Sequence, residues 1–288
     1  MSEKVKLRHV WLLFKNSFIE FIRDKSFIHG ASLAYYTIVA LVPMLYLSFI
    51  SIGRFLGQEE LIKIVSNVAR EQIGIDDVSW LVEALTLVDL GKGNFVLQLV
   101  GVIVLAFSAS AIFSSLRASL NVFFDVEKTE TKKSFFHGIL SRGVSFLMLT
   151  LVAVVVIVFY FLETAFVSFG SSLFGSDAHT YLIYFFEHTA SLMSNIIIFL
   201  FMFKYLHDGK IDWLIAFKGA LFTGSLVYIG QLLIKFYLTN YFFAAGGGVA
   251  GTILVILAWM FYSSQIIFLG AKVTMVYARM VGRPILPK

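Results

Sequence analysis

The residues able to do chemistry are few, and their spacing fits no hydrolytic site. The sequence contains no G-x-S-x-G, no H-E-x-x-H and no phosphate-binding P-loop. It has no cysteine, which excludes disulfides, thiolate metal sites and cysteine nucleophiles, and its six histidines are scattered without the spacing of metal ligands. We therefore expect no catalytic residue, no metal and no cofactor, and we predict that the protein is not an enzyme.

Polar side chains inside long apolar runs are the next candidates, because burying them in hydrocarbon is costly. Asn195, Gln231 and Gln265 are such residues, and each could either line a substrate path or hydrogen-bond to a neighbouring helix. Tyr35 has the same two interpretations. Pro43 falls in the middle of an apolar run, where it removes one helical hydrogen bond and should kink the helix, either for packing or for movement.

Charged and polar residues near the ends of these runs form a second group. Arg117 and Asn121 lie four positions apart, hence on one helical face, and Asp125 follows one turn later. They could form a cytoplasmic gate or lock, whereas Arg117 alone would suit an anchor to lipid headgroups. Lys272, at the end of the last apolar run, is also expected to be an anchor. The candidates for a substrate path or gate are Tyr35, Pro43, Arg117, Asn121, Asn195, Gln231 and Gln265.

Glycines supply the last candidate feature. Gly246, Gly247 and Gly248 lie in the run AAGGGVAG, which is flexible because glycine restricts the backbone so little. The run can form a tight or re-entrant turn between two spans, or a backbone-lined contact to a ligand.

The elements that must position these residues are membrane-spanning helices. The 288 residues are 59% hydrophobic and 14% charged, which is more apolar surface than a water-soluble core could hide. A spanning helix needs about 20 mostly apolar residues, and runs of that length recur along the chain. We predict an all-α polytopic integral membrane protein with a single membrane domain, 1–288, whose six spans lie at 30–53, 94–116, 141–163, 184–205, 214–238 and 249–272.

Two segments outside the spans also show helical periodicity. In residues 1–29, apolar residues such as Val10, Phe14 and Phe18 recur at helical spacing, which predicts an amphipathic helix in the cytoplasmic membrane interface. Residues 54–93 contain two further patterns of this kind and more acidic than basic residues, which predicts an extracytoplasmic helical hairpin.

The distribution of basic residues predicts the orientation. Most of the 23 lysines and arginines fall in 1–29, 117–142, 204–218 and 272–288, which the predicted spans place on one and the same side of the membrane. The positive-inside rule then places both termini in the cytoplasm. These basic residues lack the aromatic interleaving of a nucleic-acid site, so we expect membrane lipids and no nucleic acid as their partners.

Three stretches resemble the bacterial YihY/BrkB family of inner-membrane proteins: GASLAYYTIVALVPMLYLSFISIG, SSLRASLNVFFDV and GGVAGTILVILAWMFYSSQIIFLGAKV. The resemblance extends over nearly the whole chain. The positions that match family features are Tyr35, Pro43, Asn121, Gly219, Gly248, Trp259, Gly270 and Ala271. The departures from the pattern include Ala40, where members often have serine, and Lys272, where they often have glutamate.

The resemblance implies a six-span protein of the bacterial inner membrane. Some members were historically labelled ribonuclease BN, but nothing in this sequence supplies a general base, a metal site or a phosphate cradle. Others are associated with serum resistance or lipid traffic, and any proton-coupling or gating role of the family glutamate would be missing here because of Lys272.

Two functions are consistent with these observations. The first is transport or flipping of a lipid or other amphipathic envelope molecule, because charges are scarce within the spans while the chain has 31 phenylalanines and 12 tyrosines. The alternative is a non-transporting scaffold that docks a periplasmic protein partner through residues 54–93. An ion channel would need a ring of oxygens or charges. The sequence leaves the substrate, the energy source and the oligomeric state open.

Overall fold

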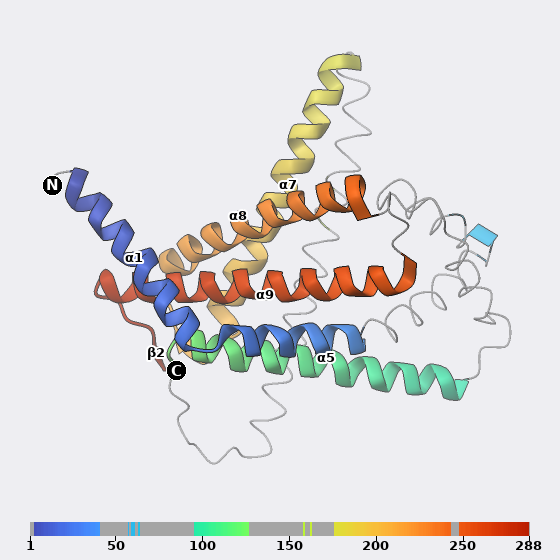
Figure 1. Ribbon diagram of the computed structural model, residues 1–288, viewed down its shortest axis with the longest axis horizontal. Helices are drawn as coiled ribbons and strands as arrows, with labels where there is room; N and C mark the ends of the chain where they lie inside the picture. Colours follow the sequence, from blue (N-terminus) through green and yellow to red (C-terminus); the bar gives the residue numbers. More distant parts are fainter. Residues whose placement is uncertain are drawn as a thin grey trace. The chain divides into compact units, whose positions relative to one another are not determined.

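A computed structural model describes residues 3–40, 57, 59–60, 63, 95–126, 158, 162, 176–242 and 248–287 (Figure 1). Pro43, Gly246 and Gly247 lie outside the described residues, as do nearly all of the segments 54–93 and 141–163. The helical hairpin and the third span therefore stay predictions, as do the number of spans and their orientation.

The described residues are mostly helical, as expected for an all-α membrane protein. The main helices are α1 (Glu3–Arg23), a helix over 26–40, α5 (Phe95–Phe123), α7 (Ser176–Tyr205), α8 (Trp213–Tyr237) and α9 (Gly248–Met280). A short π-helical turn, Leu238–Phe242, follows α8. Two two-residue strands, β1 (Gly209–Lys210) and β2 (Leu286–Pro287), pair antiparallel.

Helices α8 and α9 have the length and composition needed to cross a membrane, over Trp213–Tyr237 and Ile253–Met280. At 1.5 Å per residue, the 25 residues of α8 extend about 37 Å, which exceeds the roughly 30 Å hydrocarbon core of a bilayer. Aromatic residues mark both of its ends, since Trp213 and Tyr237 are each about half exposed. Such residues are typical of the membrane–water interface.

The contacts divide the chain into two compact units. Unit 1 comprises Met1–His29, Ser114–Ile229 and Ser263–Lys288, and unit 2 comprises Gly30–Phe113 and Gly230–Tyr262. The helix over 26–40, α5, α8 and α9 each contribute residues to both units. Unit 1 therefore contains both described ends of the chain together with α1, α7 and the small sheet.

In unit 1, α8 and α9 approach closely through a reciprocal pair of Gly-x-x-x-Thr sequences. A Cβ atom at Gly219 would overlap Thr274, and a Cβ atom at Gly270 would overlap Thr223. Each threonine hydroxyl donates to the carbonyl of the glycine in its own helix, Thr223 to Gly219 at 2.8 Å and Thr274 to Gly270 at 2.6 Å. The hydroxyls are thus satisfied within their helices, and small residues let the two backbones meet.

The core of unit 1 is aromatic and joins α5, α7 and α9. Phe123 of α5 stacks on Phe268 of α9 with ring centroids 4.6 Å apart, and Phe124 makes an edge contact with Phe203 of α7 at 5.5 Å. All four rings are essentially inaccessible to solvent. Large fixed aromatic contacts of this kind hold the helix ends in one arrangement.

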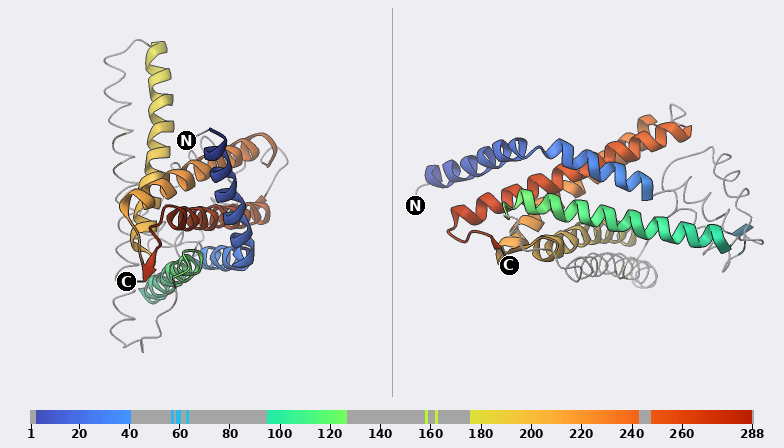
Figure 2. Two further views of the ribbon diagram at one scale, coloured as in Figure 1. Left: turned by 90° about the vertical axis from the view of Figure 1, so that its left-hand side faces the viewer. Right: turned by 90° about the horizontal axis from the view of Figure 1, so that it is seen from below.

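Helix α1 lies beside the C-terminal part of α9, as both views in Figure 2 show. Ser17 is fully buried, and its hydroxyl donates to the Leu13 carbonyl at 2.7 Å. This small side chain lets α1 pack closely against the rest of unit 1. Phe21 is buried against Phe123 of α5. Trp11 and Phe18, on the neighbouring face of α1, are 68% and 57% exposed. The predicted apolar stripe of α1 is therefore covered by other helices at Phe21 and exposed at Trp11 and Phe18.

Unit 2 is described by short stretches of four helices. Gly230 of α8 packs against the Trp259 and Tyr262 rings of α9, so a Cβ atom there would lie 2.9 Å from Tyr262 Cε1. Leu33 and Ala34 are buried on the helix over 26–40. In the unit 2 parts of the helix over 26–40, α5, α8 and α9, Lys235 is the one charged side chain among the described residues, whereas Glu59, Glu60 and Lys63 are charged helical residues outside these four helices.

Candidate functional site

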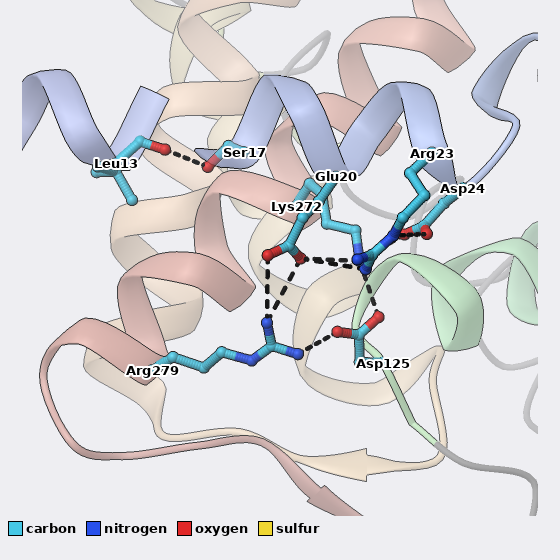
Figure 3. Close-up of polar contacts among 8 residues, drawn as sticks. All are labelled: Leu13, Ser17, Glu20, Arg23, Asp24, Asp125, Lys272 and Arg279. Carbon is cyan, nitrogen blue, oxygen red and sulfur yellow. Dashed lines mark hydrogen bonds and ion pairs between the residues drawn. The ribbon is translucent and has the colours of Figure 1, made fainter. Parts of the chain in front are cut away.

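The most unusual side chain in unit 1 is Lys272, which is charged, lies about two turns before the end of α9 and is fully buried. Its ammonium faces carboxylates from two other helical segments (Figure 3). Nζ lies 2.6 Å from Asp24 Oδ2, 2.9 Å from Asp125 Oδ1 and 3.7 Å from Glu20 Oε2. We call Glu20, Asp24, Asp125, Lys272 and Arg279 the Lys272 cluster.

Arg279, two turns after Lys272 on α9, is the second cation of the cluster. It pairs with Asp125, and its Nη1 lies 3.4 Å from both oxygens of Glu20. Arg23 of α1 adds a third cation at the edge, 3.6 Å from Asp24. With Arg23 included, three cations face the three carboxylates of the cluster, so the charges balance.

Local backbone structure explains how the carboxylates converge. Glu20 and Asp24 lie four residues apart and therefore on one face at the end of α1. Asp125 follows α5 with a positive φ of 51°. The amides of Asp125 and Val126 donate to the carbonyls of Val122 and Asn121, at 3.1 and 2.9 Å, which is the hydrogen-bond pattern of a Schellman motif. Aspartate is one of the few residues that tolerate this conformation.

The burial of Lys272 shows why all these partners are needed. Removing an ammonium from water costs several kcal/mol, which only close opposite charges can offset. The expectation that Lys272 ends the last span as a headgroup anchor is therefore wrong. α9 continues past it to Met280, and Asp24 and Asp125 neutralise its charge inside the protein in place of water or headgroups.

A second polar group joins α5 to the connection between α7 and α8. Arg117 pairs with Asp208, and Asn121 Nδ2 donates to the other carboxylate oxygen of Asp208 at 2.7 Å. The Asp208 amide in turn donates to Asn121 Oδ1 at 2.8 Å. Arg117 and Asn121 therefore do share one helical face and one partner, but that partner is Asp208. Asp125, which follows them in the sequence, pairs with Lys272.

The connection that carries Asp208 is itself held firmly. His207 is fully buried, accepts a hydrogen bond from the Gly209 amide at Nδ1 (2.9 Å) and donates from Nε2 to the Phe203 carbonyl (2.5 Å). These bonds describe a neutral imidazole protonated at Nε2. A Cβ atom at Gly209 would lie 2.6 Å from Ile285 and 2.8 Å from Val126, so the C-terminal tail packs tightly over this turn.

His29 links the beginning of the helix over 26–40 to α5. Because the Ser119 hydroxyl already donates to the Ser115 carbonyl at 2.8 Å, its oxygen accepts the proton of His29 Nδ1, also at 2.8 Å. The imidazole ring also contacts Phe123 and Phe268 edge-on. Burial lowers the pKa of His29 below its ordinary value, and the nearby carboxylate of Asp24 opposes this shift.

The other predicted site residues are not gathered into these groups. Gln265 donates to the Ser26 carbonyl at 3.3 Å, one turn from His29. Tyr35 is 64% exposed and contacts Tyr36 edge-on. Asn195 and Gln231 are half-buried on α7 and α8. Gly248 is the first residue of α9, and the remaining candidates, Pro43, Gly246 and Gly247, lie outside the described residues.

Glu20, Asp24, Asp208 and Arg279 are not among the site residues predicted from the sequence. The spacing could have grouped some of them within each helix. Glu20 and Asp24 share a helical face with Phe21, and Lys272 and Arg279 lie seven residues, or two turns, apart. Nothing in the local sequence indicates that these two faces meet, because the pairs join residues about 250 positions apart.

The comparison with known proteins agrees with this architecture. The family model described as Virulence factor BrkB matches residues 17–287, which includes every residue of the Lys272 cluster. No solved structure matches the chain. Since the family match extends over nearly all 288 residues and the described helices are long and apolar, the chain is a membrane protein that belongs to the virulence factor BrkB family.

Proposed function

We propose that this protein moves a lipid or another amphipathic envelope molecule across the bacterial inner membrane. The observation that carries the proposal is the Lys272 cluster, in which α1, the end of α5 and α9 are tied together by buried ion pairs. The sequence predicts that these helix ends lie on the cytoplasmic side. Ion pairs there can hold a cytoplasmic gate closed, and they can exchange when it opens.

The distribution of charge supports an amphipathic cargo over a small ion. In unit 2, the described residues of the helix over 26–40, α5, α8 and α9 carry a single charged side chain, Lys235, which is exposed in the last turn of α8. Ion pathways need rings of oxygens or charges along their length. Apolar helix surfaces of this kind suit a molecule with acyl chains better than they suit a small ion.

The first experiment is lipid movement in reconstituted vesicles. Purified protein is placed in liposomes containing a fluorescent phospholipid, and dithionite is added to destroy the fluorophores of the outer leaflet. Protein-free vesicles should lose about half of the signal. Vesicles with active protein should lose clearly more, because inner-leaflet lipid reaches the outside.

Two arginines of the C-terminal region provide a matched pair of variants. Arg279 belongs to the Lys272 cluster, whereas Arg283 pairs with Asp212 at 3.0 Å outside it, and both are about half exposed. Arg279→Gln weakens the lock and should raise the rate of lipid movement by up to about fivefold, since a partly exposed pair contributes at most about 1 kcal/mol. Arg283→Gln should leave the rate unchanged.

The scaffold function is the outcome that would replace this proposal. If the wild-type protein and both variants leave dithionite bleaching at the protein-free level, lipid movement is not supported. Mass spectrometry of protein purified in mild detergent from its own membranes then gives the second readout. A periplasmic protein retained with it, in place of a stoichiometric lipid, would favour docking through residues 54–93.

A further inference from the structure

The carboxylates around Lys272 fall into two groups that differ in how firmly they are held. Asp125 belongs to the end of α5, where the Schellman hydrogen bonds determine its position. Glu20 and Asp24 belong to α1, which joins the helix over 26–40 through a short turn containing Lys25 with a φ of 55°. A rotation at this turn would remove both carboxylates from α9 and separate Phe21 from Phe123, while Asp125 would keep its place at the end of α5.

The charges show what such a movement would expose. When α1 is docked, Glu20 and Asp24 balance the cations of α9. When α1 leaves, Lys272 and Arg279 keep Asp125 as their partner, so two cations face one carboxylate. The site then has a net positive charge in a position that was buried, and an anion of suitable size would be attracted to it.

Glu20 already occupies the place of such an anion. One of its oxygens lies 3.7 Å from Lys272 Nζ, and both lie 3.4 Å from Arg279 Nη1, so a single anionic group bridges the two cations. A phosphate has the same capacity, because it offers several acceptor oxygens to an arginine fork and a lysine ammonium. The remaining α1 surface is suited to a membrane, since Trp11, Phe18 and Lys15 are exposed there.

We propose that Glu20 and Asp24 are an internal substitute for the phosphate of an anionic lipid headgroup, which binds Lys272 and Arg279 when α1 swings away. Helix α1 is thus a displaceable lid that competes with the ligand. The choice of a lipid as the source of the phosphate rests on the proposed function, but binding can be measured without any transport.

The experiment uses the absence of cysteine from the chain. Asn16→Cys on α1 and Met280→Cys at the end of α9 are both exposed positions of unit 1, and spin labels on them report whether α1 is docked. The full-length double variant in a neutral detergent is titrated with short-chain phosphatidic acid, with phosphatidylcholine and with inorganic phosphate. Phosphatidic acid should lengthen the distance between the labels, and phosphatidylcholine should not.

Single substitutions test the competition. Glu20→Gln removes one internal competitor and should lower the half-saturating concentration of phosphatidic acid by roughly tenfold, whereas Arg279→Gln should raise it by a similar factor. Arg283→Gln should leave it unchanged. Arg279 is half exposed, so its variant is expected to fold, which gel filtration and circular dichroism check.

Each other result contradicts the inference. An equal response to phosphatidylcholine, an unchanged label distance, or equal effects of Arg279→Gln and Arg283→Gln would each overturn the anionic headgroup site. The same response to inorganic phosphate alone would assign the site to free phosphate instead of lipid. Binding of phosphatidic acid without lipid movement in vesicles would support this site and contradict the transport function, so the two failures are distinguishable.

Discussion

At the scale of single residues, Lys272 shows how a chain that is mostly apolar can hold a charge inside a helix. The three carboxylates at 2.6, 2.9 and 3.7 Å provide the partners that water would otherwise supply. Burial and pairing depend on one another, because removing either half of a buried pair leaves an uncompensated charge. The stability of the helix ends should therefore depend strongly on this one ammonium.

Lys272→Met is expected to lower the free energy of unfolding by about 3–5 kcal/mol, because it preserves much of the side-chain volume but leaves the carboxylates facing one another. Thermal unfolding in a fixed detergent provides the measurement. Arg283→Gln removes an exposed pair and should change stability by less than about 1 kcal/mol. Similar losses from both variants would show that the cluster does not stabilise the protein.

His29 predicts a dependence of stability on pH. Because burial lowers the pKa of His29 in the folded protein below the ordinary value of 6.5, the unfolded chain binds a proton more readily. The contribution of His29 to stability is complete above pH 6.5 and is lost as the pH falls through the lower, folded value.

This effect can be separated from the acid sensitivity of the carboxylates. His29→Gln keeps a donor toward Ser119 but cannot be protonated, so its melting temperature should fall less than that of the wild type between pH 7.5 and pH 5.5. If the melting temperatures of the two proteins fell equally with pH, His29 would not contribute to the pH dependence of stability.

At the scale of elements, the crossing of α8 and α9 depends on two glycines that match positions in the sequence resemblance. Gly219 and Gly270 each face a threonine of the other helix so closely that a methyl group would overlap it. Glycine is needed here for space and not for backbone conformation. The sequence marks these positions only as small residues in apolar runs, and the partner threonines become apparent when the helices are packed.

Gly270→Ala should destabilise unit 1 by about 1–3 kcal/mol through overpacking, which thermal unfolding would detect. Adding Thr223→Ala removes the overlapping hydroxyl and should restore part of the loss, although the Cβ atom of residue 223 would still lie 2.9 Å away. Gly230→Ala is the control, because its nearest neighbour is the outer edge of the Tyr262 ring, which can move. Equal effects at both glycines would contradict the close crossing.

At the scale of the whole molecule, orientation is the property that links the Lys272 cluster to the cytoplasm. The prediction rests on the basic residues at the helix ends and on the positive-inside rule. Helix α8 provides a direct test, since Trp213 and Tyr237 mark its opposite ends and Asn240 follows in the exposed π-helical turn.

Single cysteines in this cysteine-free chain can report the side of the membrane. A membrane-impermeant maleimide added to spheroplasts should label Asn240→Cys at once, and should label Asn16→Cys and Arg283→Cys only after lysis. Labelling of Asn16→Cys in intact cells would reverse the orientation, and the proposed gate would then face the periplasm.

Much of this architecture can be predicted from local sequence. The apolar runs indicate membrane helices because about 20 uncharged residues in succession are stable mainly in lipid, and spacing alone places Arg117 and Asn121 on one face. The partners of Asp125 and the burial of Lys272 could not be predicted in this way. Their partners lie on other helices, up to about 250 residues away, and a buried charge is tolerated only where packing brings opposite charges to it.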